Sequence, residues 1–193
     1  MRIYLLLPFL LSCSAASMAG EPATGPLEQD AARLSQQFVG QLKPQLKSAM
    51  KEGGATLAIE ICASVAPTIA DSLSAESGWL VKRVSLKSRN ASRAVPDAWE
   101  RSVLRQFDQR QAAGGTGQTI AYGATTGDQY RYMQAQIVEP ICLVCHGENL
   151  TEPVRATLQQ YYPDDWATGY TLGQVRGAIS LTKNLPTTDS AQP

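Results

Sequence analysis

Apolar side chains recur at helical spacing in two stretches near the start of the chain. The first covers residues 27–52 and the second about residues 56–73, with a Gly-Gly pair between them, and this spacing predicts two amphipathic helices. We expect Pro44 to bend the first helix and Pro67 to break the second locally, because proline lacks the amide hydrogen that a helix interior uses. Alternation over residues 57–61 leaves a strand as an alternative there. The apolar positions are Leu34, Phe38, Leu42 and Leu46, and then Cys62, Val65, Ala66, Ile69 and Leu73.

Farther along, the pattern alternates as strands do, with shorter helices in between. The predicted strands cover residues 79–86, 119–123, 129–138 and 175–181, and the predicted helices cover residues 97–107 and 153–162. Residues 125–128 suit the loop of a hairpin between the second and third strands, and the glycine-rich residues 114–117 suit a turn. Helices first, followed by strands interrupted by helices, indicate an α+β domain around a central sheet.

The N-terminal residues have the features of an export signal. Arg2 precedes a short apolar run, residues 3–11, whereas about 20 residues are needed to span a bilayer. Ser17-Met18-Ala19 resembles the site that signal peptidase cleaves, so we expect a periplasmic protein. In the alternative, Cys13 ends a lipobox-like segment, becomes lipidated and anchors the protein to a membrane. The expected organisation is a signal peptide over residues 1–19, a linker over 20–26, one domain over 27–185 and a loose tail over 186–193.

Composition places the chain among ordinary globular proteins. It has 193 residues, 44% of them hydrophobic and 18% charged, which suits a single domain with its own core. Lys plus Arg and Asp plus Glu both number 17, so no basic field favours a nucleic acid as a partner. The chain has four cysteines and one histidine, so any chemistry that needs an imidazole must use His146.

The motif Cys142-Leu143-Val144-Cys145-His146 is the attachment sequence for c-type haem. Two thiols three residues apart on one helical turn reach the two haem vinyl groups, and the adjacent imidazole becomes the proximal iron ligand. One alternative is a redox disulfide between the two cysteines, which an oxidising compartment permits. Another is a Cys₃His zinc site completed by Cys62, which is disfavoured because the adjacent Cys145 and His146 would be strained in binding one ion. The sequence therefore predicts one covalent haem c.

The second axial position of the iron has several candidates. It cannot be a histidine, because the chain has no other. Cys62, Met133 and Met50 remain, together with an open position that water or a gas would occupy. We favour Cys62, since an unpaired thiol in an exported chain invites oxidation and so suggests a role beyond packing.

Several blocks of the chain together resemble a bacterial family of single-haem c-type proteins, long known only as a domain of unknown function. The blocks are residues 58–67, 78–79, 85–90, 96–100, 142–147 and 175–180. The resemblance implies a PAS-like fold, with a central antiparallel sheet, N-terminal and flanking helices, and the haem in the core. It also implies covalent attachment through Cys142 and Cys145, and iron bound by His146 and Cys62. Ala91 departs from the family, which usually has proline after Arg-Asn.

Near these blocks, Arg83, Arg89 and Asn90 are candidates for contacts with the haem propionates, since arginine forms paired hydrogen bonds with carboxylates. A thiolate ligand stabilises ferric iron, so histidine and cysteine together should give a low reduction potential. Filled axial positions argue against an enzyme. We therefore expect an exported monohaem cytochrome that transfers electrons between a donor and an acceptor protein. The alternative is a redox or gas sensor in which CO or NO displaces Cys62 and a separate partner receives the signal.

Overall fold

The structure, a computed structural model, describes residues 25–114 and 119–186. Its elements are α1 (Pro26–Ser77), β1 (Leu80–Val84), α2 (Ala98–Ala112), β2 (Ala121–Thr126), β3 (Gln129–Ile137), the 3₁₀ helix η1 (Pro140–Cys142), α3 (Leu143–His146), α4 (Glu152–Tyr161) and β4 (Val175–Asn184). The predicted signal peptide with Cys13, most of the predicted linker, the centre of the turn at 114–117 and nearly all of the predicted tail lie outside the described residues.

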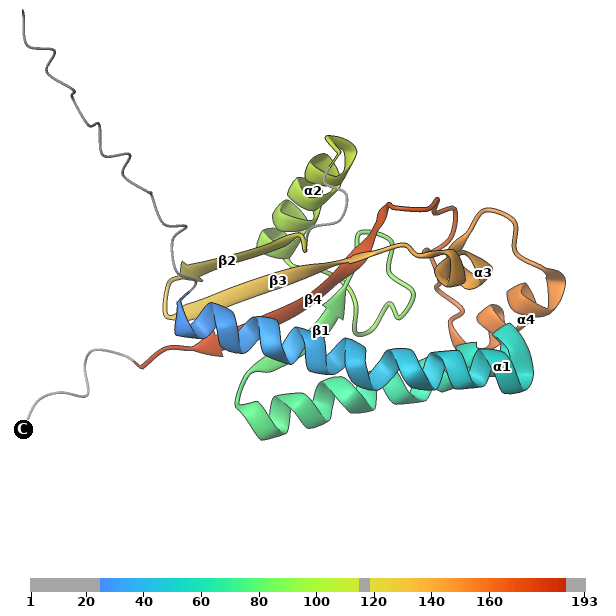
Figure 1. The fold of residues 1–193 in the computed structure, drawn as a ribbon, viewed down its shortest axis with the longest axis horizontal. Helices are drawn as coiled ribbons and strands as arrows, with labels where there is room; N and C mark the ends of the chain where they lie inside the picture. The colour runs from blue at the N-terminus through green and yellow to red at the C-terminus, as the bar shows by residue number, and fades with distance from the viewer. Residues whose placement is uncertain (1–24, 115–118, 187–193) are drawn as a thin grey trace, which may run out of the picture.

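The four strands form one antiparallel sheet in the order β1-β4-β3-β2 (Figure 1). The last strand, β4, lies between β1 and β3, with Ile179 opposite Arg83 of β1 and Ser180 opposite Met133 of β3. The ladder between β3 and β4 is irregular after Gln136. Across the sheet Gly177 approaches β1 so closely that a Cβ atom there would lie 2.4 Å from the carbonyl oxygen of Val84. The prediction of an α+β domain with a central antiparallel sheet is confirmed.

Helix α1 folds back on itself as two antiparallel arms (Figure 1). The chain reverses at Gly54, whose φ of 70° and ψ of −159° suit glycine alone. We call residues 26–53 the first arm and residues 55–77 the second arm. The two predicted helices are confirmed, and the strand alternative for residues 57–61 is wrong. A break at Pro67 is also wrong, because Gly54 is the residue of α1 that departs from helical angles, and the fixed φ of proline is itself compatible with a helix.

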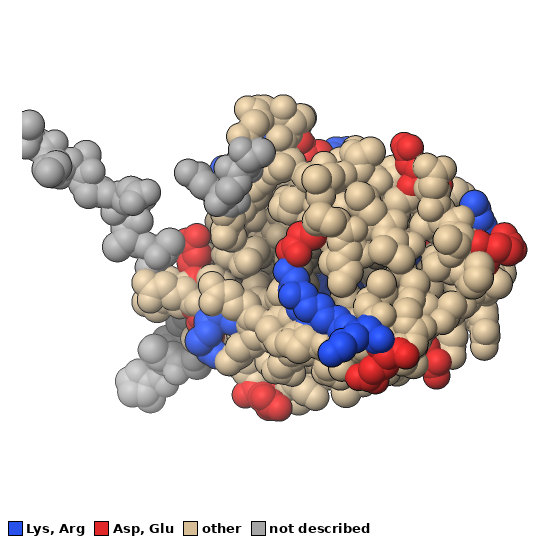
Figure 2. Space-filling model, turned by 45° about the vertical axis from the view of Figure 1, so that its right-hand side comes forward, with Lys and Arg blue, Asp and Glu red and all other residues tan. Residues whose placement is uncertain are grey.

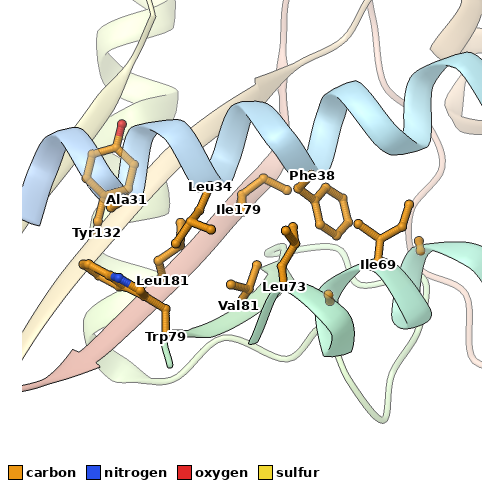
Figure 3. Close-up of a cluster of buried hydrophobic side chains, with 12 residues drawn as sticks. Ala31, Leu34, Phe38, Ile69, Leu73, Trp79, Val81, Tyr132, Ile179 and Leu181 are labelled. Carbon is orange, nitrogen blue, oxygen red and sulfur yellow. The ribbon is translucent and has the colours of Figure 1, made fainter. Parts of the chain in front are cut away.

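The arms of α1 cover one face of the sheet (Figure 3). Buried side chains from both arms meet those of β1, β3 and β4, and the indole of Trp79 donates a hydrogen bond to Asp30 at 2.8 Å. Helix α2 covers the opposite face, where Phe107 packs near Met133. The main cluster on the α1 side contains Leu34, Phe38, Ile69, Leu73, Trp79, Val81, Tyr132, Ile179 and Leu181. The sheet therefore lies between two helical layers.

Among the described residues, α1 is the helix that is long and apolar enough to cross a membrane by length and composition. Core helices of other proteins pass the same test. Here the helix turns back at Gly54, and Leu34 and Leu73 of its two arms belong to one buried cluster. We therefore treat α1 as part of the folded domain. On the face drawn in Figure 2, Lys and Arg side chains lie beside Asp and Glu side chains, and most of the surface is uncharged.

Candidate functional site

A cavity lies between the two arms of α1, strand β1, and the ends of β3 and β4 that lead to and from the Cys-x-x-Cys-His motif. It is lined by every candidate site residue of the sequence analysis except Met133. The candidates that meet here are Cys62, Cys142, Cys145, His146, Met50, Arg83, Arg89 and Asn90. Apolar side chains of α1, among them Leu42, Leu46 and Ile59, complete the wall. Segments far apart in the sequence thus converge on one space.

The motif occupies a short helical segment between β3 and α4. Cys142 ends η1, and residues 143–146 form the single turn α3. Pro140 at the start of η1 suits the first turn of a helix, where its missing amide hydrogen has no partner to lose. An ion pair of 2.6 Å between Glu139 and Lys43 ties this segment to the first arm of α1. Because Cys142 and Cys145 are three apart on one turn, both thiols lie on the same side, toward the cavity.

The two alternative interpretations of the motif find no geometric support. All three cysteines of the described residues are unpaired, so Cys142 and Cys145 do not form the disulfide of the redox interpretation. Within residues 25–114 and 119–186, no three His, Cys, Asp or Glu side chains converge on a metal-binding point. The structure therefore gives the Cys₃His zinc interpretation no support, although Cys62 and the motif line one cavity.

His146 is held in one orientation and one tautomer. Its Nδ1 lies 2.7 Å from the carbonyl oxygen of Ala167, and because a carbonyl only accepts, Nδ1 must be the donor. Its own carbonyl accepts from the backbone amide of Tyr170 at 2.9 Å. Burial, assisted by the charges of Arg176 and Arg89, lowers the pKa of His146 well below its usual value. The ring is therefore neutral and keeps a lone pair on Nε2, which is the form that binds a metal.

Arg176 lies across the face of this ring. Its Nε is 3.0 Å from Nδ1 and 3.4 Å from Nε2 of His146. A donor in the ring plane cannot be that close to both nitrogens, and Nδ1 already uses its hydrogen on Ala167, so the guanidinium stacks on the imidazole. Burial and the charge of Arg83 lower the pKa of Arg176 to about 10. The side chain remains a cation at neutral pH.

Arg89 connects three segments around the motif. It donates from Nε and Nη2 to one carboxylate oxygen of Asp165, at 3.1 and 3.0 Å, and from Nη2 to the carbonyl of Cys145. Both side chains of the ion pair are almost buried, with 11% and 9% of their surface exposed. Asp165 also accepts from the amide of Ala167, whose carbonyl holds His146. Arg89 is therefore a structural cation with its own counter-charge.

Cys62 faces the motif from the second arm of α1. It is partly buried, and burial raises the pKa of its thiol while Arg83 and Arg89 act to lower it. Burial also raises the pKa of Cys145, and the proximity of Cys62 contributes in the same direction. The buried Tyr162 lies beside them, and burial together with Cys62 raises its pKa to about 12. Cys62 and the motif thus line the same cavity.

The other candidate ligands differ in position. Met50 lines the cavity from the first arm of α1. Met133 is fully buried in the cluster between the sheet and α2, so this alternative ligand lies on the opposite face of the sheet from the arms of α1. The amide oxygen of Asn90 accepts from Ser92, and Asn90 belongs to the turn that follows Arg89.

Sequence reasoning missed three parts of this site. The carbonyl of Ala167 and the carboxylate of Asp165 come from a loop without a recognisable pattern. Arg176 carried a signal, because a charged residue stands inside the apolar strand that begins at Val175. A charge in a strand buried on both faces must have a partner or a function.

The chain was compared with protein families, curated proteins and solved structures. The model of the Tll0287-like family matches residues 23–183. In a solved structure, the cyanobacterial heme-protein Tll0287 is 28% identical, and the match covers 86% of this chain and 99% of that chain with a TM-score of 0.62. No curated protein matches. Since the family model spans most of its length, the chain belongs to the Tll0287-like family.

Proposed function

We propose that this protein is an exported monohaem cytochrome that carries one covalent haem c and transfers electrons. Cys142 and Cys145 form the thioether bonds, His146 is the proximal iron ligand and Cys62 is the distal ligand. The observation that carries the proposal is that the attachment motif and Cys62, which are about 80 residues apart in the sequence, line one cavity. The likeness to a protein described as a heme-protein supports the same cofactor.

The residues of the cavity fit a haem in three respects. Apolar side chains of both arms of α1 form walls suited to a porphyrin face. The tautomer of His146 leaves the lone pair of Nε2 available for coordination. Arg176 lies over the face of the ring, and Nη1 of Arg89 is 3.5 Å from Nε2, too far for a good hydrogen bond. Arg83 lines the cavity without an acidic partner among the described residues, so a carboxylate of the cofactor would have a counter-charge.

Electron transfer follows from what these side chains do. When bound, the haem would supply an iron that takes up and releases one electron. Ala167 fixes the proximal ring by accepting from Nδ1, which makes the imidazole a stronger donor. Cys62 would lose its thiol proton on binding iron, and a thiolate ligand favours the ferric state and a low reduction potential. With both positions taken by side chains, substrates are kept from the iron, so we favour a carrier over an enzyme.

A redox or gas sensor is the second candidate. It is favoured by the place of Cys62 on an arm that also packs against α4, where Ile59 shares a buried cluster with Val154 and Leu158. Release of Cys62 from iron, on reduction or by CO or NO, would free this arm to move against α4. A separate partner protein would then receive the signal.

The test is electron paramagnetic resonance of the ferric holoprotein, made in a host that attaches c-type haem. We expect a mass increase of one haem and a low-spin signal typical of thiolate. Cys62→Ala should abolish that signal, whereas Met50→Leu, a change at another residue of the same cavity, should keep it. A protein without attached haem, or a signal unchanged in Cys62→Ala, contradicts the proposal.

The same samples distinguish carrier from sensor. A haem that stays six-coordinate after reduction and does not bind CO supports electron transfer. Loss of the thiolate on reduction, followed by CO binding, supports sensing.

A further inference from the structure

Most cations around the cavity already have a counter-charge. Lys43 pairs with Glu139, Arg89 with Asp165, and Arg93 with Asp71. Arg83, Arg176 and Lys47 also line the cavity, and no acidic group within the described residues forms an ion pair with any of them. Lys47 is exposed to solvent, whereas Arg83 is partly buried and Arg176 is buried.

Arg176 is a buried cation held by neutral groups alone. It is 9% exposed, and its Nη1 donates to the hydroxyl of Ser85 at 2.9 Å and to the carbonyl of Lys87 at 3.3 Å. Its Nε lies over the ring of His146, and in the part of the chain that the structure describes its Nη2 has no acceptor. Burying a charge without a partner is costly, so this arrangement calls for an anion on the cavity side.

Among the described residues, Arg83 is a second cation without an ion pair in the lining of the same cavity. It extends from β1, opposite Ile179 of β4, and is partly buried. Its guanidinium has no hydrogen-bond acceptor among residues 25–114 and 119–186, and its charge acts to lower the pKa values of both Cys62 and Arg176. Two neighbouring guanidinium groups repel each other unless an anion lies between or beside them.

We propose that Arg83 and Arg176 bind the two propionates of the haem, and that Arg176 thereby connects one propionate to the orientation of His146. This inference rests on the proposed function, because it needs a haem in the cavity. It favours Arg176 over Arg89 as a propionate contact, since Arg89 is neutralised by Asp165, and over Asn90, which brings no charge. The two arginines are the unpaired cations of the cavity that are withdrawn from solvent, because Lys47, which also lines it without an ion pair to any described residue, is exposed. Arg176 is in this sense a positioning residue for the proximal ligand.

The test separates the propionate charge from the rest of the cofactor. The full chain with Cys142→Ala and Cys145→Ala cannot form thioether bonds, so its affinities for haemin and for haemin dimethyl ester, which lacks the two carboxylate charges, would be measured and compared. We expect the parent to prefer haemin by about a hundredfold, about tenfold for each arginine–carboxylate pair. Arg83→Gln and Arg176→Gln should each lower this preference about tenfold. Arg93→Gln, at a paired cation of the same cavity, should leave it unchanged.

The ratio of the two affinities is insensitive to a merely structural effect, because such an effect weakens both ligands alike. If a Gln variant does not fold, as judged by circular dichroism, the Lys variant replaces it; it keeps the charge without paired hydrogen bonds, so a smaller preference than in the parent is expected. A preference unchanged in the variants, or no preference in the parent, overturns the inference. The proposed function is judged independently, by covalent haem in the protein with its cysteines intact.

Discussion

The ion pair between Arg89 and Asp165 gives the sharpest prediction about how the site is held together. Asp165→Asn removes the negative charge but keeps an oxygen that can accept from the amide of Ala167. Arg89 would then remain nearly buried without a counter-charge. The loop that carries Ala167 would lose one of its attachments to the turn after β1, while the hydrogen bond from the amide of Trp166 to the carbonyl of Ser88 would remain.

The expected magnitude follows from burial. Removing one partner of a buried pair costs about 3–5 kcal/mol, whereas exposed pairs contribute about 0–1 kcal/mol. With 11% and 9% of the two side chains exposed, the pair belongs to the first class, and we expect the lower end, about 3 kcal/mol, because the hydrogen bond to the carbonyl of Cys145 survives. With a slope of about 2 kcal/mol per molar urea, the unfolding midpoint should fall by about 1.5 M.

The assay is urea unfolding of the haem-free full chain, followed by circular dichroism. Asp71→Asn is the matched control, because its pair with Arg93 is exposed, with 61% and 47% of the side chains accessible, and it should shift the midpoint by less than about 0.5 M. Arg89→Gln combined with Asp165→Asn should cost less than the sum of the single changes. If Asp165→Asn costs no more than Asp71→Asn, or if the double variant is additive, the pair is effectively solvated and the reasoning is refuted.

Further predictions concern the helical hairpin, the start of α2 and export. Gly54→Ala should destabilise the protein by about 1–3 kcal/mol because of its positive φ, whereas Gly40→Ala, in the helical first arm with open space around it, should stabilise it by about 0.5–1 kcal/mol; thermal unfolding of both tests this, and equal effects would contradict it. Asp97→Asn keeps a capping oxygen but loses the ion pair with Arg131, at a cost of about 0.5–1 kcal/mol at pH 7. Burial acts to raise the pKa of Asp97, but hydrogen bonds from Glu100 and Arg131 outweigh it, so the pKa in the folded protein is lowered. The Asp97 carboxylate therefore stabilises the fold above the ordinary pKa of an aspartate, and this stabilisation is lost as the pH falls through the lowered pKa. A cost of Asp97→Asn that persists at pH 2 would contradict this reasoning. Mass spectrometry of the exported protein should find Gly20 at its N-terminus, and a lipid on Cys13 would instead support the anchored form.

The parts of the fold that depend on local sequence were predictable. The apolar stripe through Leu34 and Phe38 and the Gly-Gly pair predict the two arms of α1, because helical periodicity and a positive φ act over a few residues. Strand β4 extends to Asn184, beyond the predicted end at residue 181, since Thr182 to Asn184 are polar but pair with β1 or β3. The position of β4 inside the sheet depends on long-range pairing, which no local pattern contains.

The candidate site also has a part that local sequence predicts and a part that depends on long-range contacts. The motif that ends at His146 is local, and its cysteines were identified from their spacing. Which arginine is free to bind an anion was not predictable, because Arg89 meets Asp165 across 76 residues of sequence and Arg176 finds no acidic partner among the described residues. Met133 was equally ambiguous, since only the pairing of β3 decides which face of the sheet it takes.

The central place of β4 also determines when the domain can assemble. Strand β1 has β4 as its sheet neighbour, so the N-terminal part of the chain cannot complete the sheet before residues 175–184 are available. Contacts between such distant segments form late in folding. Until then Cys142, Cys145 and His146 belong to an open segment without walls. If haem is attached as proposed, the motif would therefore be accessible to the attaching enzyme before β4 joins the sheet, and the cavity would close around the haem afterwards.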